Sequence, residues 1–330
     1  MTINHNDDAF ATMLLMSQIT PSREELVRPF STAEWHALHS RAREAGLPGL
    51  GALLGLDMSG FMMKLDLTEQ EAYRLCVLLS RTLPLSMSLE RFAMNGIEVA
   101  TYFERAYPQR LRERLGTAAP PMIYLGGRSE LFLQDAIAIV GALSARGEAE
   151  AAVRTLTQLA VAQGYVVVTD GSVGLSRIAE DEAIRAGGRT VEVAADALTT
   201  RVAQRDMLFM IEMRQGAALS LVHPDAPYTM SHAQRRNKCV YALAQAAFVF
   251  AVEEKKGAAW DGACEALTRR WCDALYAWDT DLYSGNRALI ARGATPVSKI
   301  TPASFDQMAL TWRSQAARQL SMFDRAEPLP

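Results

Sequence analysis

The chain has 330 residues, of which 49% are hydrophobic and 22% are charged. This composition is typical of a globular protein with about two domains, and it excludes a disordered, collagen-like or mainly coiled-coil chain. The formal net charge is −3, so no basic field covers the molecule as a whole. A nucleic-acid-binding function would therefore need a local cluster of Lys and Arg.

The cysteines and the apolar stretches favour a cytoplasmic protein. No Cys-x-x-Cys pair occurs, and no histidine stands at metal-ligand spacing from a cysteine, so we expect reduced core thiols and no metal. The N-terminus lacks the basic and apolar pattern of a secretory signal. The longest apolar stretches, 47–56 and 239–252, are shorter than the ~20 residues that a membrane span needs. We therefore expect no association with a membrane.

Short helices are predicted along the first hundred residues. Ser31 with Glu34 and Thr68 with Glu71 have the spacing of capping boxes, each followed by an apolar stripe. The glycine-rich residues 46–51 interrupt the helical pattern between them. These patterns predict a small helical domain over residues 1–100.

From residue 136 onwards, short apolar runs alternate with amphipathic segments. This pattern predicts parallel strands that helices cover on both faces, in a doubly wound α/β domain over residues 101–300. The predicted strands are 136–140, 165–169, 190–193, 217–221, 247–252 and 274–278. A C-terminal helix and a flexible tail are expected over residues 301–330.

Glycines follow three of the predicted strands, at Gly141, Gly171 and Gly257. Because the backbone turns sharply at the carboxyl edge of such a sheet, we expect the ligand site there. No Gly-x-Gly-x-x-Gly and no Walker-type sequence occurs, so neither a nicotinamide nor an ATP cofactor is expected. The turn that contains Ser172 has backbone donors suited to an anion, and a purely structural turn explains it equally well.

Basic residues stand at three of the predicted junctions between a strand and a helix. They are Arg235, Arg236 and Lys238, then Lys256, then Arg287. On composition alone a solvated basic helix end explains the first group better than a phosphate site does. Their repetition along one sheet edge favours an anionic ligand.

An ordered set of motifs resembles the DNA-processing protein A (DprA/Smf) family. The motifs are Tyr-Pro-Gln-Arg-Leu at 107–111, the segment 120–127, Ala-Ile-Val-Gly at 138–141, Arg-Asn-Lys at 236–238, Lys-Gly-x-x-Trp-x-Gly-Ala at 256–263 and the segment 285–294. The resemblance implies an extended Rossmann-like domain preceded by a helical domain. It also implies single-stranded DNA held in a positive pocket, loading of a RecA-like recombinase and a homo-oligomer.

Two turns depart from the family pattern and indicate a divergent branch. The family usually has Gly-Ser-Arg at the first turn, where this chain has Gly141, Ala142 and Leu143. At the second turn Asp170 adds a carboxylate. We therefore expect weaker binding of phosphate at this pocket.

These observations lead to two hypotheses of different class. In the first, the chain binds single-stranded DNA in DNA processing or recombination, and the phosphate contacts are those of Arg235, Arg236, Lys238, Lys256 and Arg287. Trp260 either stacks on a base or packs in the core. In the second, the chain is a nucleotide-sensing module of a bacterial defence system. No arrangement of His223, His232, Asp170, Glu180 and Asp261 fixes a catalytic pair, so a binding protein is expected rather than an enzyme.

The C-terminal string Gln319, Leu320, Ser321, Met322 and Phe323 resembles the clamp-binding peptide of bacterial replication proteins. Its apolar side chains stand in a polar surrounding, which suits anchors for a partner's pocket. The string therefore predicts a contact with a sliding clamp. Alternatively, Leu320 and Phe323 fold back onto the sheet domain.

Overall fold

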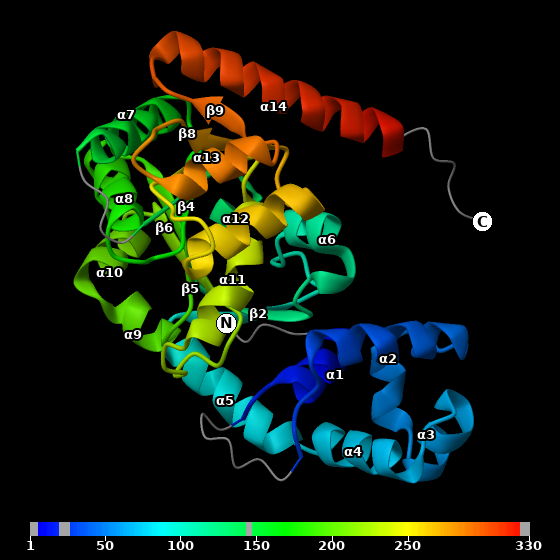
Figure 1. Ribbon diagram of the computed structural model, residues 1–330. Coiled ribbons are helices and arrows are strands. Elements are labelled where there is room, and N and C mark those ends of the chain that lie inside the picture. The colour runs from blue at the N-terminus through cyan, green and yellow to red at the C-terminus, as the bar shows by residue number, and fades with distance from the viewer. Residues whose placement is uncertain (1–5, 20–26, 143–146, 324–330) are drawn as a thin grey trace.

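A single nine-stranded sheet runs through the molecule, with helices on both of its faces (Figure 1). The computed structural model describes residues 6–19, 27–142 and 147–323, and over 315–323 it describes only the helical backbone. The strands are β1 (Ile97–Thr101), β2 (Met122–Gly127), β3 (Ala136–Gly141), β4 (Val166–Thr169), β5 (Arg189–Ala194), β6 (Gly216–Ser220), β7 (Ala246–Phe250), β8 (Ala274–Trp278) and β9 (Thr295–Val297).

The order across the sheet is β1-β2-β6-β5-β4-β3-β7-β8-β9. The seven strands from β6 to β9 are parallel, whereas β1 and β2 join the edge as antiparallel strands. The mostly parallel α/β fold and its six central strands are confirmed, with bounds that differ by one or two residues. Strands β1, β2 and β9 were not predicted.

Alternating side chains of the central strands build two separate apolar cores. Ala138 and Val140 of β3 belong to the core on one face, and Ile137 and Ile139 belong to the core on the other. Such alternation is expected where helices cover both faces of a sheet. The first face carries α6 (Gln109–Leu115), α11 (Met230–Leu243), α12 (Gly257–Arg269) and α13 (Ser284–Ala291). The second carries α7 (Glu148–Ala162), α8 (Leu175–Arg185) and α14 (Pro302–Phe323).

Five helices precede the sheet and form what we call the helical region (Figure 1). They are α1 (Asp7–Met16), α2 (Thr32–Glu44), α3 (Met58–Leu65), α4 (Glu69–Leu79) and α5 (Thr82–Met94). Both predicted capping boxes are present, at the starts of α2 and α4. The glycine-rich break after α2 leads into a 3-10 helix, Leu50–Gly55. A core around Trp35 fills the helical region, and a second cluster joins α1 and α5 to β1 and β2. The domain boundaries near residues 100 and 300 stay predictions.

Among the described residues, none of the helices has the length and apolar character needed to cross a bilayer. The two remaining helices, α9 (Leu198–Ala203) and α10 (Arg205–Glu212), follow β5 and precede β6.

Candidate nucleic-acid interface

A cleft of about 800 Å³ opens at the carboxyl edge of the parallel strands. Strands β4 and β7 lie on opposite sides of β3, so the direction of winding reverses at this place. Open α/β sheets bind their ligands at such a reversal, because the loops on either side part there. The cleft contains six of the predicted site residues: Gly141, Gly171, Ser172, Arg236, Lys256 and Gly257.

Gly141 ends β3 and has a packing reason to be glycine. A Cβ atom there would lie 2.6 Å from Leu175 Cδ1 and 2.9 Å from the Phe250 carbonyl oxygen. The four residues that follow Ala142, at 143–146, lie outside the described part of the chain. The structure therefore describes only Gly141 and Ala142 of the first predicted turn.

The turn after β4 uses its own carboxylate as a hydrogen-bond acceptor. Asp170 Oδ1 accepts from the Ser172 backbone N–H at 3.0 Å and from the Ser172 hydroxyl at 2.6 Å. It also accepts from the Ser176 hydroxyl at 2.7 Å. Gly171 has φ +64°, and its Cα packs so closely on Glu192 that a Cβ would lie 2.4 Å from the carboxylate. The donors of Ser172 that were predicted to hold an anion are thus engaged by Asp170.

Asp170 also pairs with Arg236 of α11. The Arg236 Nη2 lies 2.8 Å from Asp170 Oδ2, and the two side chains are 8% and 13% exposed. Arg236 Nη1 donates to the carbonyl oxygen of Asp170 and, at 3.3 Å, to that of Val193. The expectation that Asp170 weakens the anion site therefore has a structural basis, because its carboxylate neutralises the guanidinium nearest to the turn.

Below this turn lies a buried network of carboxylates and guanidinium groups. Arg201 Nε pairs with Glu192 at 2.5 Å, and Arg201 Nη1 lies 3.1 Å from Asp206. Arg177 pairs with Glu180 at 3.1 Å, and Thr169 donates its hydroxyl to Glu180. Burial, reinforced by the nearby charge of Glu192, raises the pKa of Glu180 to about 7.

This shift predicts a pH dependence of stability. Because the pKa of Glu180 in the folded protein lies above its ordinary value of 4.5, the folded state binds more protons than the unfolded state between pH 4.5 and 7. The contribution of Glu180 to the free energy of unfolding therefore falls as pH rises through this range, by at most about 3 kcal/mol. Urea unfolding at pH 5.5 and pH 8 should show a smaller fall for Glu180→Gln than for the wild type.

Glu182 on the same helix is the control. The hydrogen bond from Gln158 lowers the pKa of Glu182, so this carboxyl is ionised in the folded state throughout that range. Glu182→Gln should leave the difference between pH 5.5 and pH 8 as it is in the wild type. An unchanged difference in Glu180→Gln would show that Glu180 does not titrate there.

Lys256 stands at the N-terminus of α12, on the other side of the cleft. Its side chain is exposed and pairs with no carboxylate within the described residues. The other cations that line the cleft, Arg177, Arg201 and Arg236, all form ion pairs. Gly257 is exposed, has φ +79°, and a Cβ there would meet no atom within 4 Å. The first N–H groups of a helix such as α12 have no acceptor within the helix. Lys256 is thus the lining cation best placed to meet a phosphate.

The basic residues of α11 do not form one cluster. Arg236 lines the cleft, whereas Arg235 and Lys238 line a separate cavity described below. Asn237, between them, donates to the Ala258 carbonyl oxygen at 2.5 Å and joins α11 to α12. Neighbouring positions on a helix lie about 100° apart, so consecutive basic residues face different sides. Arg235, Arg236 and Lys238 therefore do not meet at one site, and that each contacts a phosphate stays a prediction.

Two other predicted residues lie away from the cleft. Arg287 pairs with Asp281 at 2.9 Å on the exposed surface of α13 and does not line the cleft. Trp260 is 5% exposed within the core, with the Arg292 guanidinium 5.0 Å from its ring centroid. Of its two expected roles, the structure supports packing in the core. The string from Gln319 to Phe323 lies in the last turns of α14, where side chains fall outside the described residues.

Aromatic and apolar side chains at the rim were not predicted. Tyr228 and Met230, just before and at the start of α11, are each 56% exposed and line the cleft. Val173 is 69% exposed on the facing turn. Exposed aromatic side chains in a groove are the usual platforms for the bases of single strands. A lone tyrosine in a loop carries no periodic signal, so only the fold identifies it.

The cleft as a whole is balanced in charge. Its lining carries four cations, named above, and four carboxylates, those of Asp170, Glu192, Asp196 and Glu253. Within the described residues, no group of three or more His, Cys, Asp or Glu side chains could hold a metal ion. A ligand of this cleft would therefore be held by Lys256, by backbone donors and by the exposed rim rather than by a strong positive field.

Comparison with known proteins gives the family. The model of the DNA recombination-mediator protein A family matches residues 98–305. No curated protein sequence matches the chain significantly. Among solved structures, DNA processing protein A from Streptococcus pneumoniae superimposes with a TM-score of 0.58 at 17% identity, covering 82% of this chain and 95% of that one.

A second solved structure is DNA processing protein A from Helicobacter pylori, described for its mode of binding single-stranded DNA. It superimposes with a TM-score of 0.53 at 19% identity, covering 65% of this chain and 95% of that one. At such identities the structural matches show the fold alone. The family model spans more than half of the chain, and the chain belongs to the DNA recombination-mediator protein A family.

Proposed function

We propose that this chain binds single-stranded DNA in the cleft and acts in DNA recombination. The observation that carries the proposal is that Lys256 and Tyr228 line the same open cleft and are both exposed. Lys256 forms no ion pair with a carboxylate among the described residues. A lysine for the backbone and an aromatic ring for a base are what a single strand requires. Membership of the family supports the proposal, as does the single-stranded DNA binding described for the Helicobacter pylori protein.

The start of α12 supplies the second kind of phosphate contact. The N–H groups of its first turn have no acceptor within the helix, and the helix dipole places positive potential there. Lys256 is the N-cap residue, so its ammonium group and these N–H groups serve the same anion. The strand would then pass Tyr228 and Met230 at the start of α11, where its bases can stack.

Fluorescence polarisation with a labelled oligo-dT strand tests the proposal. The wild type should bind, with an affinity that falls steeply as salt rises, because neutralised phosphates release counterions. Lys256→Ala should weaken binding and reduce the salt slope by about 0.7, the value for one phosphate of a single strand. Tyr228→Ala should cost about 1–3 kcal/mol of binding free energy, the usual range for one stacked base.

Each variant has a matched control. Tyr73 of α4 is 57% exposed, almost as much as Tyr228, and lies outside the cleft. Lys299 is an exposed lysine that does not line the cleft. Tyr73→Ala and Lys299→Ala should bind as the wild type does. Absence of binding even at low salt, or equal losses in the controls, would refute the proposal.

A nucleotide-sensing module is the second candidate, and the balanced charge of the cleft favours it. A small nucleotide needs fewer phosphate contacts than a strand, so one lysine and one helix start suffice. Calorimetry separates the two functions. Saturable binding of a mononucleotide that Lys256→Ala abolishes, with no affinity for oligo-dT, would favour the sensing module of a defence system.

The other proposed partners follow from resemblance to known proteins. A DNA recombination mediator would act in the cytoplasm, on a RecA-like recombinase and as a homo-oligomer. The clamp-binding string predicts that a sliding clamp is recovered with the wild-type chain and not with a Leu320→Ala/Phe323→Ala variant. Equal recovery of the clamp with both chains would show that the string is part of α14 and does not bind the clamp.

A further inference from the structure

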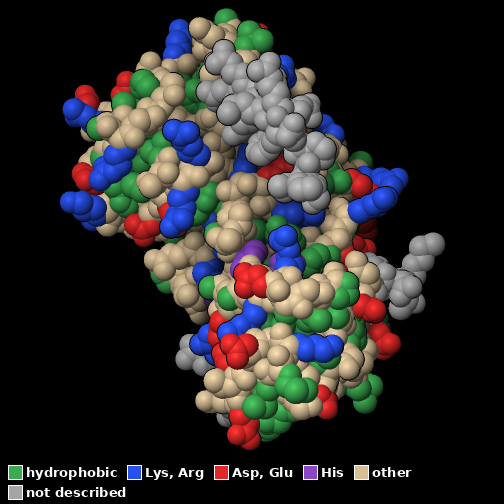
Figure 2. Space-filling view, turned by 90° about the vertical axis from the view of Figure 1, so that its right-hand side faces the viewer, with side chains coloured by type: hydrophobic (Ala, Val, Ile, Leu, Met, Phe, Trp, Pro, Cys, Tyr) green, Lys and Arg blue, Asp and Glu red, His purple; other side chains and the backbone are tan. Residues whose placement is uncertain are grey.

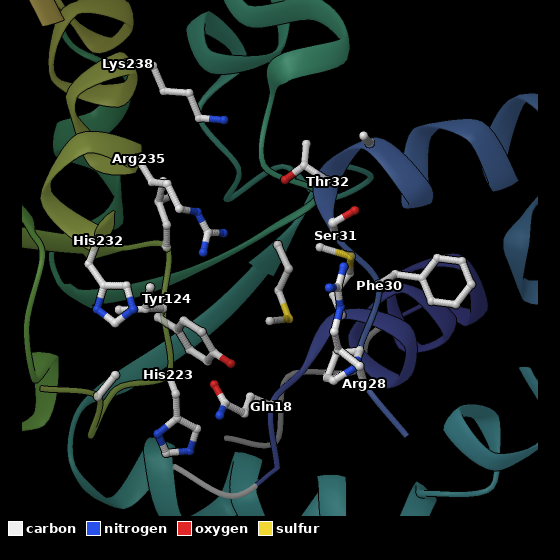
Figure 3. Close-up of a pocket in the computed structure, with 17 residues that line it drawn as sticks. Gln18, Arg28, Phe30, Ser31, Thr32, Tyr124, His223, His232, Arg235 and Lys238 are labelled. Atoms are coloured by element: carbon white, nitrogen blue, oxygen red, sulfur yellow. The ribbon is translucent and has the colours of Figure 1, made fainter. Parts of the chain in front are cut away.

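A second cavity, of about 820 Å³, lies between the helical region and the sheet. We call it the interface cavity (Figure 3). One wall is formed by Gln18 and by residues 28–33 at the start of α2, and the opposite wall is the face of α11 that carries His232, Arg235 and Lys238. Tyr124 of β2 and His223 lie between the two walls. A molecule bound here would touch both parts of the chain.

Among the described residues, the lining of the interface cavity is basic and contains no carboxylate. Three of its 17 residues are Lys or Arg, namely Arg28, Arg235 and Lys238, and two are histidines. None is Asp or Glu. Figure 2 shows histidine together with Lys and Arg side chains at the junction between the two parts of the molecule. This lining contrasts with the balanced charge of the cleft.

Two of these cations lie close together, and neither forms an ion pair within the described residues, although the charge of Glu265 acts on Lys238. Arg235 and Lys238 are three positions apart on α11 and therefore share one face. Arg235 is exposed and pairs with no carboxylate in the part of the chain that the structure describes. The Lys238 ammonium donates to the Ala118 carbonyl oxygen at 2.5 Å, and burial lowers its pKa. An anion between them would relieve their mutual repulsion.

The rest of the cavity is suited to the remainder of a small molecule. Figure 3 shows the Tyr124 hydroxyl and the Gln18 amide near each other, beside the His223 ring. Met16 and Met122 add apolar surface. Sites for small ligands usually enclose about 300–1,000 Å³ and combine apolar walls with a few polar groups. The volume and the lining match a molecule of the size of a mononucleotide.

We propose that the interface cavity binds a small phosphorylated molecule of mononucleotide size, with its phosphate on Arg235 and Lys238. The remainder of the molecule lies toward Tyr124 and Gln18. Such a ligand contacts both the helical region and the sheet domain, because each of them forms one wall of the cavity. This site is separate from the cleft, and the proposal does not depend on DNA binding there.

Isothermal calorimetry with inorganic phosphate and with adenosine monophosphate tests the proposal. Both should bind the wild type, and Arg235→Glu should weaken both at least tenfold. Arg105, exposed in a turn outside the cavity, gives the control. Arg105→Glu should bind both probes as the wild type does. Thermal melting of both variants checks that they fold.

Other variants separate this proposal from the function proposed for the cleft. Lys256→Ala should weaken oligo-dT binding and leave adenosine monophosphate binding unchanged. The proposal is overturned if the wild type binds neither probe at millimolar concentration, or if Arg235→Glu binds both as tightly as the wild type. It is also overturned if Lys256→Ala, and not Arg235→Glu, abolishes nucleotide binding. Loss of oligo-dT binding in Arg235→Glu without any binding of the two small probes would instead assign the cavity to the DNA strand.

Discussion

Arg236→Ala should lower the free energy of unfolding by about 3–5 kcal/mol, as is usual when one partner of a buried ion pair is removed. The variant leaves the Asp170 carboxylate, which is 13% exposed, without its guanidinium partner. The carbonyl oxygens of Asp170 and Val193 lose a donor at the same time. Urea unfolding followed by circular dichroism measures the loss.

The double variant Asp170→Asn/Arg236→Ala isolates the ion pair, because an asparagine keeps the oxygen that accepts from Ser172 and Ser176. Removing both charges removes the stranded carboxylate, so the double variant should be more stable than Arg236→Ala alone. The pair Arg287 with Asp281, 64% and 92% exposed, is the control, and Arg287→Ala should cost less than about 1 kcal/mol. Equal stability of Arg236→Ala and the double variant would mean that Asp170 does not need Arg236.

Trp312→Ala should lower the free energy of unfolding by about 3–5 kcal/mol, the usual cost of removing a large aromatic side chain from a core. Trp312 of α14 is fully buried, and its ring centroid lies 5.8 Å from that of Phe305 and 5.9 Å from that of Tyr165. Its indole N–H donates to the Tyr165 hydroxyl at 3.3 Å. The variant therefore leaves a cavity and an unpaired hydroxyl on that face of the sheet.

Leu310 on the same helix is the control for Trp312. It is 66% exposed, so Leu310→Ala should change the stability by less than about 0.5 kcal/mol. Both variants can be compared by urea unfolding. A cost for Trp312→Ala as small as that of Leu310→Ala would show that α14 is not part of the folded core.

The central strands were predictable because both of their faces are buried. The run 136–140 is continuously apolar, since its alternate residues enter two different cores. The short β9 holds Pro296 and has only three residues, too few to show a period. Strands β1 and β2 join the edge of the sheet as antiparallel strands, and they pair residues that lie about 20 to 30 positions apart in the sequence.

The site was predictable only in part, for reasons of geometry. The turns at Gly171 and Gly257 could be placed at the carboxyl edge because each follows an apolar run. The different directions of Arg235 and Arg236 follow from the helical period, so the sequence held that information. The pairing of Asp170 with Arg236 joins residues 66 positions apart, and no local pattern indicates it. Tyr228 likewise depends on where its loop meets the sheet.

Acylation of lysine side chains, read by mass spectrometry with and without DNA, tests most directly that the strand lies in the cleft. The lysines of the chain are Lys64, Lys238, Lys255, Lys256 and Lys299. A saturating oligo-dT strand should slow the acylation of Lys256, because its ammonium group would contact a phosphate. The reactivities of Lys64 and Lys299, both exposed outside the cleft, should stay unchanged. A bound strand that leaves the reactivity of Lys256 unchanged, or that protects only Lys64 or Lys299, would contradict binding in the cleft.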